Sequence, residues 1–167
     1  MHNKYKYERI DRSEITEEQF KDVLRVERSE GEDNCYSEEV MKELFIQDPK
    51  IDNFVCYDND RIVGYISLNP KSKRRNGSAY IISLVVDSSY RRQGIANNLI
   101  KCVAKYYLEK GEPLLMSLQV DKDNYPAINL YKKVGFEIKD PICDADIDDE
   151  QYIMDSEIRN LDKIKIL

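Results

Sequence analysis

Residues 79–97 have the sequence Ala79-Tyr-Ile-Ile-Ser-Leu-Val-Val-Asp-Ser-Ser-Tyr-Arg-Arg-Gln-Gly-Ile-Ala-Asn97. Residues 79–86 are rich in β-branched and aromatic side chains, and the run is short enough to predict a buried strand. Asp87-Ser88-Ser89 favours a turn. Between Gly94 and Gly111 apolar residues recur at helical spacing, which predicts a helix. The stretch therefore predicts a strand, then a loop whose last residues form the first turn of a helix.

Such a junction can bind an anion. The first turn of a helix has unpaired backbone N–H groups and the positive end of the helix dipole. Gly94 lets a ligand approach the backbone closely, and the small side chain of Ala96 leaves space beside it. Arg91 and Arg92 add positive charge. These features predict a pyrophosphate site at residues 91–96. The alternative is an ordinary strand-to-helix turn with two solvated arginines, and the patterns of the Walker A and Rossmann loops are missing from the stretch.

Two segments of the chain resemble a known family. Arg91-Arg92-Gln93-Gly94-Ile95-Ala96 resembles the Arg/Gln-x-x-Gly-x-Gly/Ala motif of the GNAT superfamily of acyl-CoA-dependent N-acetyltransferases. Asn124-Tyr-Pro-Ala127-Ile-Asn-Leu130-Tyr131-Lys-Lys-Val-Gly135-Phe136 is similar to that family too, and the two motifs have the family's order and usual separation. The resemblance covers roughly residues 54–140. It implies an α/β (α+β) fold, with a central mixed, mostly antiparallel twisted sheet of about seven strands flanked by about four helices.

Length and composition are compatible with that fold. The 167 residues suit one N-acetyltransferase domain spanning residues 1–167. A net charge of −6, with acidic and basic residues mixed, argues against a nucleic-acid partner and favours cationic substrates. No apolar run approaches the roughly 18 residues of a membrane span and no secretory signal is present, so we expect no membrane partner and a cytoplasmic protein. The sequence leaves open whether the chain forms a homodimer.

The four cysteines lie far apart, without Cys-x-x-Cys spacing. They predict reduced thiols and neither a disulfide framework nor a metal site. Elsewhere, alternation, capping residues and helical periodicity predict the other elements. These are an edge strand at 4–10, a helix after the capping box at 16–19, a helix after Ser37, a hairpin of 54–57 and 61–68, a strand at 114–120, a helix capped by Asn124, and final strands at 136–138 and 151–158.

The resemblance implies acetyl-CoA as the co-substrate and assigns its contacts. The strand of Leu84, Val85 and Val86 would pair its backbone with the pantetheine arm, and Asn124 would contact the same arm. The remaining cofactor residues implied by the two motifs are Arg91, Arg92, Gln93, Gly94, Ile95 and Ala96, which take the pyrophosphate, and Ala127.

Acetyl transfer to an amine requires a neutral amine, a stabilised oxyanion and a protonated leaving thiolate. The resemblance implies that Tyr131 is the general acid, although a tyrosine on the core face of a helix is the alternative. The glutamate that serves as base in some members of the family corresponds to about Tyr80, and the glutamate of its ribosomal-protein acetyltransferases corresponds to Gln119, so neither is present here. Either a water held by Glu27 or Glu30 serves as the base, or the amine arrives neutral.

Two acidic stretches, 27–33 and 144–150, fall in segments that border the acceptor cleft of the resembling family. They predict a small or basic amine acceptor, with polyamines ahead of peptides, unless both only keep the protein soluble. The resemblance implies an N-acetyltransferase in which the amine attacks the thioester directly. The alternative is a non-catalytic acyl-CoA-binding or sensing module that lacks a base.

Overall fold

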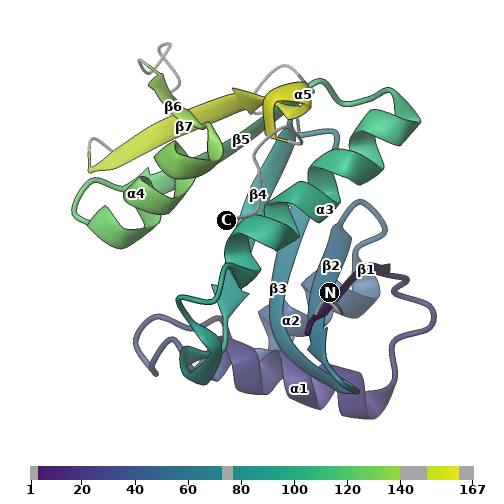
Figure 1. Cartoon of the computed structure of the whole chain (residues 1–167). Coiled ribbons are helices and arrows are strands. Elements are labelled where there is room, and N and C mark those ends of the chain that lie inside the picture. Colours follow the sequence, from purple (N-terminus) through teal and green to yellow (C-terminus); the bar gives the residue numbers. More distant parts are fainter. Residues whose placement is uncertain (1–3, 73–76, 140–149, 162–167) are drawn as a thin grey trace.

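A computed structural model describes residues 4–72, 77–139 and 150–161. Within these residues the chain forms one seven-stranded sheet with the order β1-β2-β3-β4-β5-β7-β6 (Figure 1). All neighbouring strands are antiparallel except β4 and β5, which confirms the mixed, mostly antiparallel sheet. The strands are β1 (Lys6–Ile10), β2 (Asp52–Asp58), β3 (Arg61–Asn69), β4 (Ala79–Val86), β5 (Leu115–Asp121), β6 (Glu137–Lys139) and β7 (Gln151–Glu157).

Helices cover both faces of the sheet. One buried cluster joins α1, α2 and η1 to one face of β2, β3 and β4, and a larger one joins α3, α4 and α5 to the other face. Figure 1 shows α3 crossing one face of the sheet. The helices are α1 (Glu17–Arg28), α2 (Glu38–Lys42), the π-helical turn η1 (Glu43–Gln47), the 3-10 turn η3 (Ser88–Tyr90), α3 (Ile95–Lys110), α4 (Tyr125–Val134) and α5 (Ile158–Leu161).

The sheet opens between β4 and β5. The two strands pair only at Ala79 with Met116 and at Tyr80 with Ser117. Beyond this point β5 continues to pair with β7 as far as Asp121, while β4 continues to pair with β3. Opposite the step from Ser67 to Leu68 the register shifts, so that β4 carries a bulge between Ile81 and Ser83. The two halves of the sheet therefore diverge beside the second half of β4 (Figure 1).

A glycine on β3 allows α3 to lie close to the sheet near this opening. A Cβ atom built on Gly64 would lie 3.2 Å from Cγ2 of Ile95 and 3.3 Å from the carbonyl oxygen of Val85. Ile95 is the first residue of α3, and it is buried together with Leu99 one turn later. The absent side chain at position 64 therefore sets the position of the first turn of α3.

Capping residues begin the helices as the sequence predicts. Thr16 and Gln19 form the reciprocal capping box of α1, Ser37 caps α2, and Asn124 caps α4 by accepting from the amide of Ala127 at 3.3 Å. The C-terminal end differs from the prediction. The last strand was expected to reach residue 158, but β7 ends at Glu157 and the short α5 follows. The predicted acidic stretch 144–150 lies outside the described residues except for Glu150.

None of the described helices is both long and apolar enough to span a membrane. Three of the four cysteines, Cys35, Cys56 and Cys102, lie in the described part of the chain, and all three are free thiols there.

The packing at Gly64 leads to a stability prediction. Gly64→Val should lower the free energy of unfolding by about 1–3 kcal/mol, because the new side chain has to push α3 away from β3. Gly64→Ala adds one methyl group and should lower the free energy of unfolding by less than Gly64→Val does. Urea unfolding measures both variants. An unchanged free energy of unfolding for Gly64→Val would show that α3 is not held by this contact.

Candidate active site

A cavity of about 870 Å³ lies at the opening between β4 and β5. Its walls come from β4, the loop before α3, the first turn of α3, the end of β5 and one face of α4. The residues that line it are Glu30, Leu84, Val86, Tyr90, Arg91, Arg92, Gly94, Ile95, Ala96, Asn97, Gln119, Val120, Asp121, Asn124, Pro126, Ala127, Leu130, Tyr131, Lys133 and Gln151.

One wall is a strand edge. Leu84 and Val86 line the cavity, whereas Val85 belongs to the buried cluster under α1 and α2, as strand alternation requires. Within the described residues, β4 has no partner strand on this side beyond Tyr80. Its backbone N–H and C=O groups can therefore pair with an extended ligand in the way that an added strand would.

The second wall is the N-terminus of α3. Its N-cap residue, Gly94, has a left-handed backbone with φ of 79° and provides no side-chain cap, unlike Thr16 and Asn124 at the starts of α1 and α4. A Cβ atom built on Gly94 would meet nothing within 4 Å, so the space beside it is open. Uncapped amides and open space together suit an anion such as a pyrophosphate.

The two arginines of the loop have different surroundings. The guanidinium of Arg91 pairs with the carboxylate of Glu30, and its Nε donates to the carbonyl of Val86 at 3.3 Å. Arg92 is exposed, has φ of 60° and lines the cavity. The neighbouring Gln93 does not line the cavity, because its Oε1 accepts a hydrogen bond from the hydroxyl of Tyr5 near β1.

Tyr131 lies on the cavity side of α4. Its ring packs edge-on against Phe136, with 5.7 Å between ring centroids. Burial raises the pKa of Tyr131 to about 12. The hydroxyl therefore keeps its proton at neutral pH, which is a requirement for a general acid.

Two other residues that line the cavity are not identified by the motifs. Asn97 lies in the first turn of α3, and its buried Oδ1 has no hydrogen-bond partner among the described residues. Gln119 of β5 accepts from the hydroxyl of Tyr80 at 3.0 Å. The resemblance places the base glutamates of some family members at about Tyr80 and at Gln119, and here these two residues form a hydrogen-bonded pair.

Glu27 differs from its neighbours in the acidic stretch. The sequence alternatives were a solvated charge or a carboxylate that holds a water, but the residue is only 3% exposed and does not line the cavity. Its carboxylate accepts from the amide of Tyr36 at 2.7 Å and from the hydroxyl of Tyr65. The solvated-charge interpretation is therefore wrong for Glu27, whereas Glu30 does lie at the cavity.

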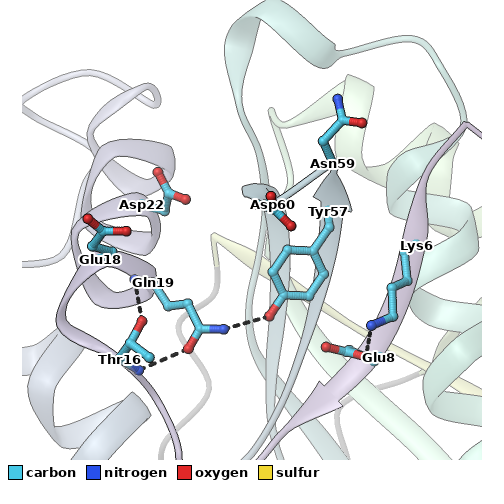
Figure 2. Close-up of a pocket in the computed structure, with 9 residues that line it drawn as sticks. All are labelled: Lys6, Glu8, Thr16, Glu18, Gln19, Asp22, Tyr57, Asn59 and Asp60. Carbon is cyan, nitrogen blue, oxygen red and sulfur yellow. Dashed lines mark hydrogen bonds and ion pairs between the residues drawn. The ribbon is translucent and has the colours of Figure 1, made fainter.

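A second, polar groove lies between α1, β1 and the end of β2 (Figure 2). It has a volume of about 410 Å³ and shares no lining residue with the first cavity. Several of its polar groups already bind one another: Lys6 pairs with Glu8 at 2.6 Å, and Gln19 donates to the hydroxyl of Tyr57 at 3.0 Å. No group of His, Cys, Asp and Glu suited to a metal ion occurs in residues 4–72, 77–139 and 150–161.

The family model for acetyltransferases of the GNAT family matches residues 16–136, which is more than half of the chain. The chain belongs to this family. Over 104 residues it is 30% identical to the L-amino acid N-acetyltransferase AaaT of Escherichia coli strain K12. This match covers 62% of the chain and 64% of AaaT, so the chain spans less than two thirds of that relative.

Solved structures of GNAT acetyltransferases share the fold. The ribosomal-protein-alanine N-acetyltransferase of Escherichia coli superimposes with a TM-score of 0.69 at 19% identity, covering 92% of this chain and 94% of that one. The PaiA N-acetyltransferase of Thermoplasma acidophilum, in complex with coenzyme A, has a TM-score of 0.66 at 19% identity, covering 91% and 99%. At these identities the likeness concerns the fold.

The uncapped start of α3 leads to a binding prediction. Gly94→Glu should weaken the binding of acetyl-CoA strongly, because the side chain fills the open space and adds negative charge beside the amides. Isothermal titration calorimetry measures the affinity. Gly111→Glu is the matched control, since Gly111 ends the same helix with the same φ of 79° and the same open surroundings. Equal affinities in both folded variants would contradict an anion site at Gly94.

Proposed function

We propose that the chain is an acetyl-CoA-dependent N-acetyltransferase that moves the acetyl group to a primary amine of a small or basic acceptor. The supporting observation is a single cavity that combines the unpaired edge of β4 with the uncapped first turn of α3. A strand edge suits the amides of a pantetheine arm, and a helix start suits a pyrophosphate. The strand edge and the helix start border the same cavity, just as the pantetheine arm and the pyrophosphate are neighbouring parts of coenzyme A.

The residues around this cavity take the following proposed roles. Leu84, Val85 and Val86 offer their backbone to the arm, and Arg92 with the amides after Gly94 binds the pyrophosphate. Arg91 belongs to the same loop, but its guanidinium pairs with the carboxylate of Glu30. The remaining cofactor contacts would come from Gln93, Ile95, Ala96, Asn124 and Ala127, of which Gln93 alone lies outside the cavity lining.

In the proposed reaction the nitrogen of the amine attacks the acetyl carbon directly. An N–H group of the unpaired β4 edge can stabilise the oxyanion of the tetrahedral intermediate. The C–S bond then breaks, and the proton of the Tyr131 hydroxyl passes to the leaving thiolate. The nitrogen gives up its surplus proton, which restores the Tyr131 hydroxyl. The products are the acetylated amine and free coenzyme A.

A non-catalytic acyl-CoA-binding module is the second candidate. The neutral pair of Tyr80 and Gln119 favours it, because neither position can take up a proton from the acceptor at neutral pH. Release of coenzyme A, measured with a thiol reagent over a panel of polyamines, aminoglycosides, amino acids and peptides, separates the two functions. Acetyl-CoA binding without release for any amine would favour the module.

Tyr131→Phe tests the general acid. The variant should lower turnover by about 10²–10⁴-fold with little change in acetyl-CoA affinity, because only the hydroxyl is lost. Since the pKa of Tyr131 is about 12, its ionisation should cause no alkaline loss of wild-type activity below about pH 11. Tyr125→Phe is the matched control, because Tyr125 lies on the same helix and is 69% exposed. Full turnover by Tyr131→Phe, with chemistry rate-limiting, would make Tyr131 a packing residue.

The acceptor preference can be tested by ionic strength. The net charge of −6, with Glu32 and Asp33 exposed after α1, supports a cationic acceptor. The kcat/KM for spermidine should fall on the order of tenfold between low and high salt, because screening removes the attraction. A monoamine such as ethanolamine should change less. If spermidine is used no better than ethanolamine, or shows no dependence on salt, the acidic residues serve solubility alone.

A further inference from the structure

We propose that Ser83, Tyr65 and Glu27 form a relay that accepts the proton of the acceptor amine, with Ser83 as the group that meets the amine. The inference rests on the proposed acetyltransferase function, and it supplies the base that the pair of Tyr80 and Gln119 cannot provide.

The three side chains form a continuous chain from the core to the surface. Glu27 on α1 is buried and accepts from the hydroxyl of Tyr65 on β3, which is itself fully buried. The Tyr65 hydroxyl lies 3.1 Å from Oγ of Ser83 on β4. Ser83 is partly exposed, so the chain of hydrogen bonds runs from the core to a residue at the surface.

The carboxylate of Glu27 determines which group donates and which accepts in each hydrogen bond of the relay. An ionised carboxylate only accepts hydrogen bonds, so Tyr65 donates to Glu27. The oxygen of Tyr65 is then free to accept, and Ser83 donates to it. With its own proton directed inward, Oγ of Ser83 presents lone pairs to the outside, where they can accept from the N–H of an ammonium group.

Ser83 also lies where the reacting end of the proposed cofactor would be. An arm that starts at the loop 91–96 and follows β4 backwards passes Val86 and then Leu84, both of which line the cavity. Ser83 is the next residue and does not itself line the cavity. Its contact with Tyr65 shows that it faces the side of the sheet covered by α1 and α2. An amine that approaches from that side would meet the thioester and Ser83 together.

The surroundings of Glu27 make it the proton acceptor of this group. The carboxylate of Glu27 accepts from the hydroxyl of Tyr65 on β3 and from the backbone amide of Tyr36, which lies between α1 and α2. The phenol of Tyr36 is the second titratable group that its charge influences. Burial and the nearby carboxylate raise the pKa of both tyrosines. Both hydroxyls therefore stay protonated at neutral pH, and the carboxylate is the member of this cluster that can take up a proton.

The proposed step conserves every proton. The ammonium N–H passes its proton to Oγ of Ser83, the Ser83 proton moves to the oxygen of Tyr65, and the Tyr65 proton moves to the Glu27 carboxylate. The freed nitrogen lone pair forms the bond to the acetyl carbon, and the C–S bond breaks as described above. The nitrogen then gives up its second surplus proton, which replaces the proton that Tyr131 has passed to the thiolate. After product release the proton returns along the same chain to solvent. Ser83 touches the substrate, whereas Tyr65 and Glu27 act through it.

The pH dependence of Ser83→Ala and Tyr65→Phe tests the relay. The assay uses the amine of the panel that has the highest kcat/KM. At pH 7 the kcat/KM of both variants should be about 100-fold below the wild-type value. The loss should shrink as the pH approaches the pKa of the amine, about 10.4 for a lysine-like group, because a neutral amine needs no base. Glu27→Gln should behave in the same way. Tyr57→Phe removes a hydroxyl from the same buried cluster without touching the relay, and it should keep the wild-type profile.

The variants also distinguish the relay from a structural role of Glu27. Ser83→Ala leaves the hydrogen bond between Glu27 and the Tyr36 amide intact. If Ser83→Ala and Tyr65→Phe keep the wild-type kcat/KM at every pH, the relay is wrong even though the protein is an acetyltransferase. A loss that is equal at all pH values would indicate damage to folding or binding and would also overturn the relay. A wild-type chain that binds acetyl-CoA but releases no coenzyme A would overturn the proposed function, and the relay with it.

Discussion

The parting of β4 and β5 after two paired residues is the constraint on which the candidate site depends. At Ala79 and Tyr80 β4 pairs with β5. After Tyr80, within the described residues, β4 continues to pair only with β3, and β5 continues to pair only with β7. A continuous sheet would place β5 against Leu84 and Val86 and leave no cavity. Because the halves diverge, the interior of the fold gains a strand edge that borders a ligand-sized space, and the start of α3 reaches the same space from the side.

Local sequence signals were sufficient for the elements around this opening. Residues 79–86 and the helix that starts after Gly94 were predicted with their observed bounds, because a β-branched run, a turn and a glycine follow one another without ambiguity. The caps at Thr16, Ser37 and Asn124 were equally local and were confirmed. The short α5 was missed because four residues carry too little periodicity to separate a helical turn from the end of a strand.

Features that depend on distant residues could not be predicted. Glu27 belongs to a run of acidic residues in the sequence, and its burial is decided by Tyr65, 38 positions away on another element. Gln93 lies inside the phosphate-loop motif, yet its side chain bonds to Tyr5, which precedes β1. The sequence shows that neither Tyr80 nor Gln119 is a glutamate that could serve as the base. Their mutual hydrogen bond follows from the parallel pairing of β4 with β5. Long-range pairing decides these side chains, and a single sequence does not encode it visibly.

The unpaired edge of β4 has a consequence for the behaviour of the protein without ligand. A strand edge with free N–H and C=O groups is a template for any other extended segment, including one from a second molecule. Polar side chains or a bulge commonly guard such edges, and here the bulge between Ile81 and Ser83 interrupts the first part of it. The segment from Leu84 to Val86 has apolar side chains only. A ligand that occupies this edge would thus act as a solubility factor, so that the chain is least prone to aggregate when its cavity is filled.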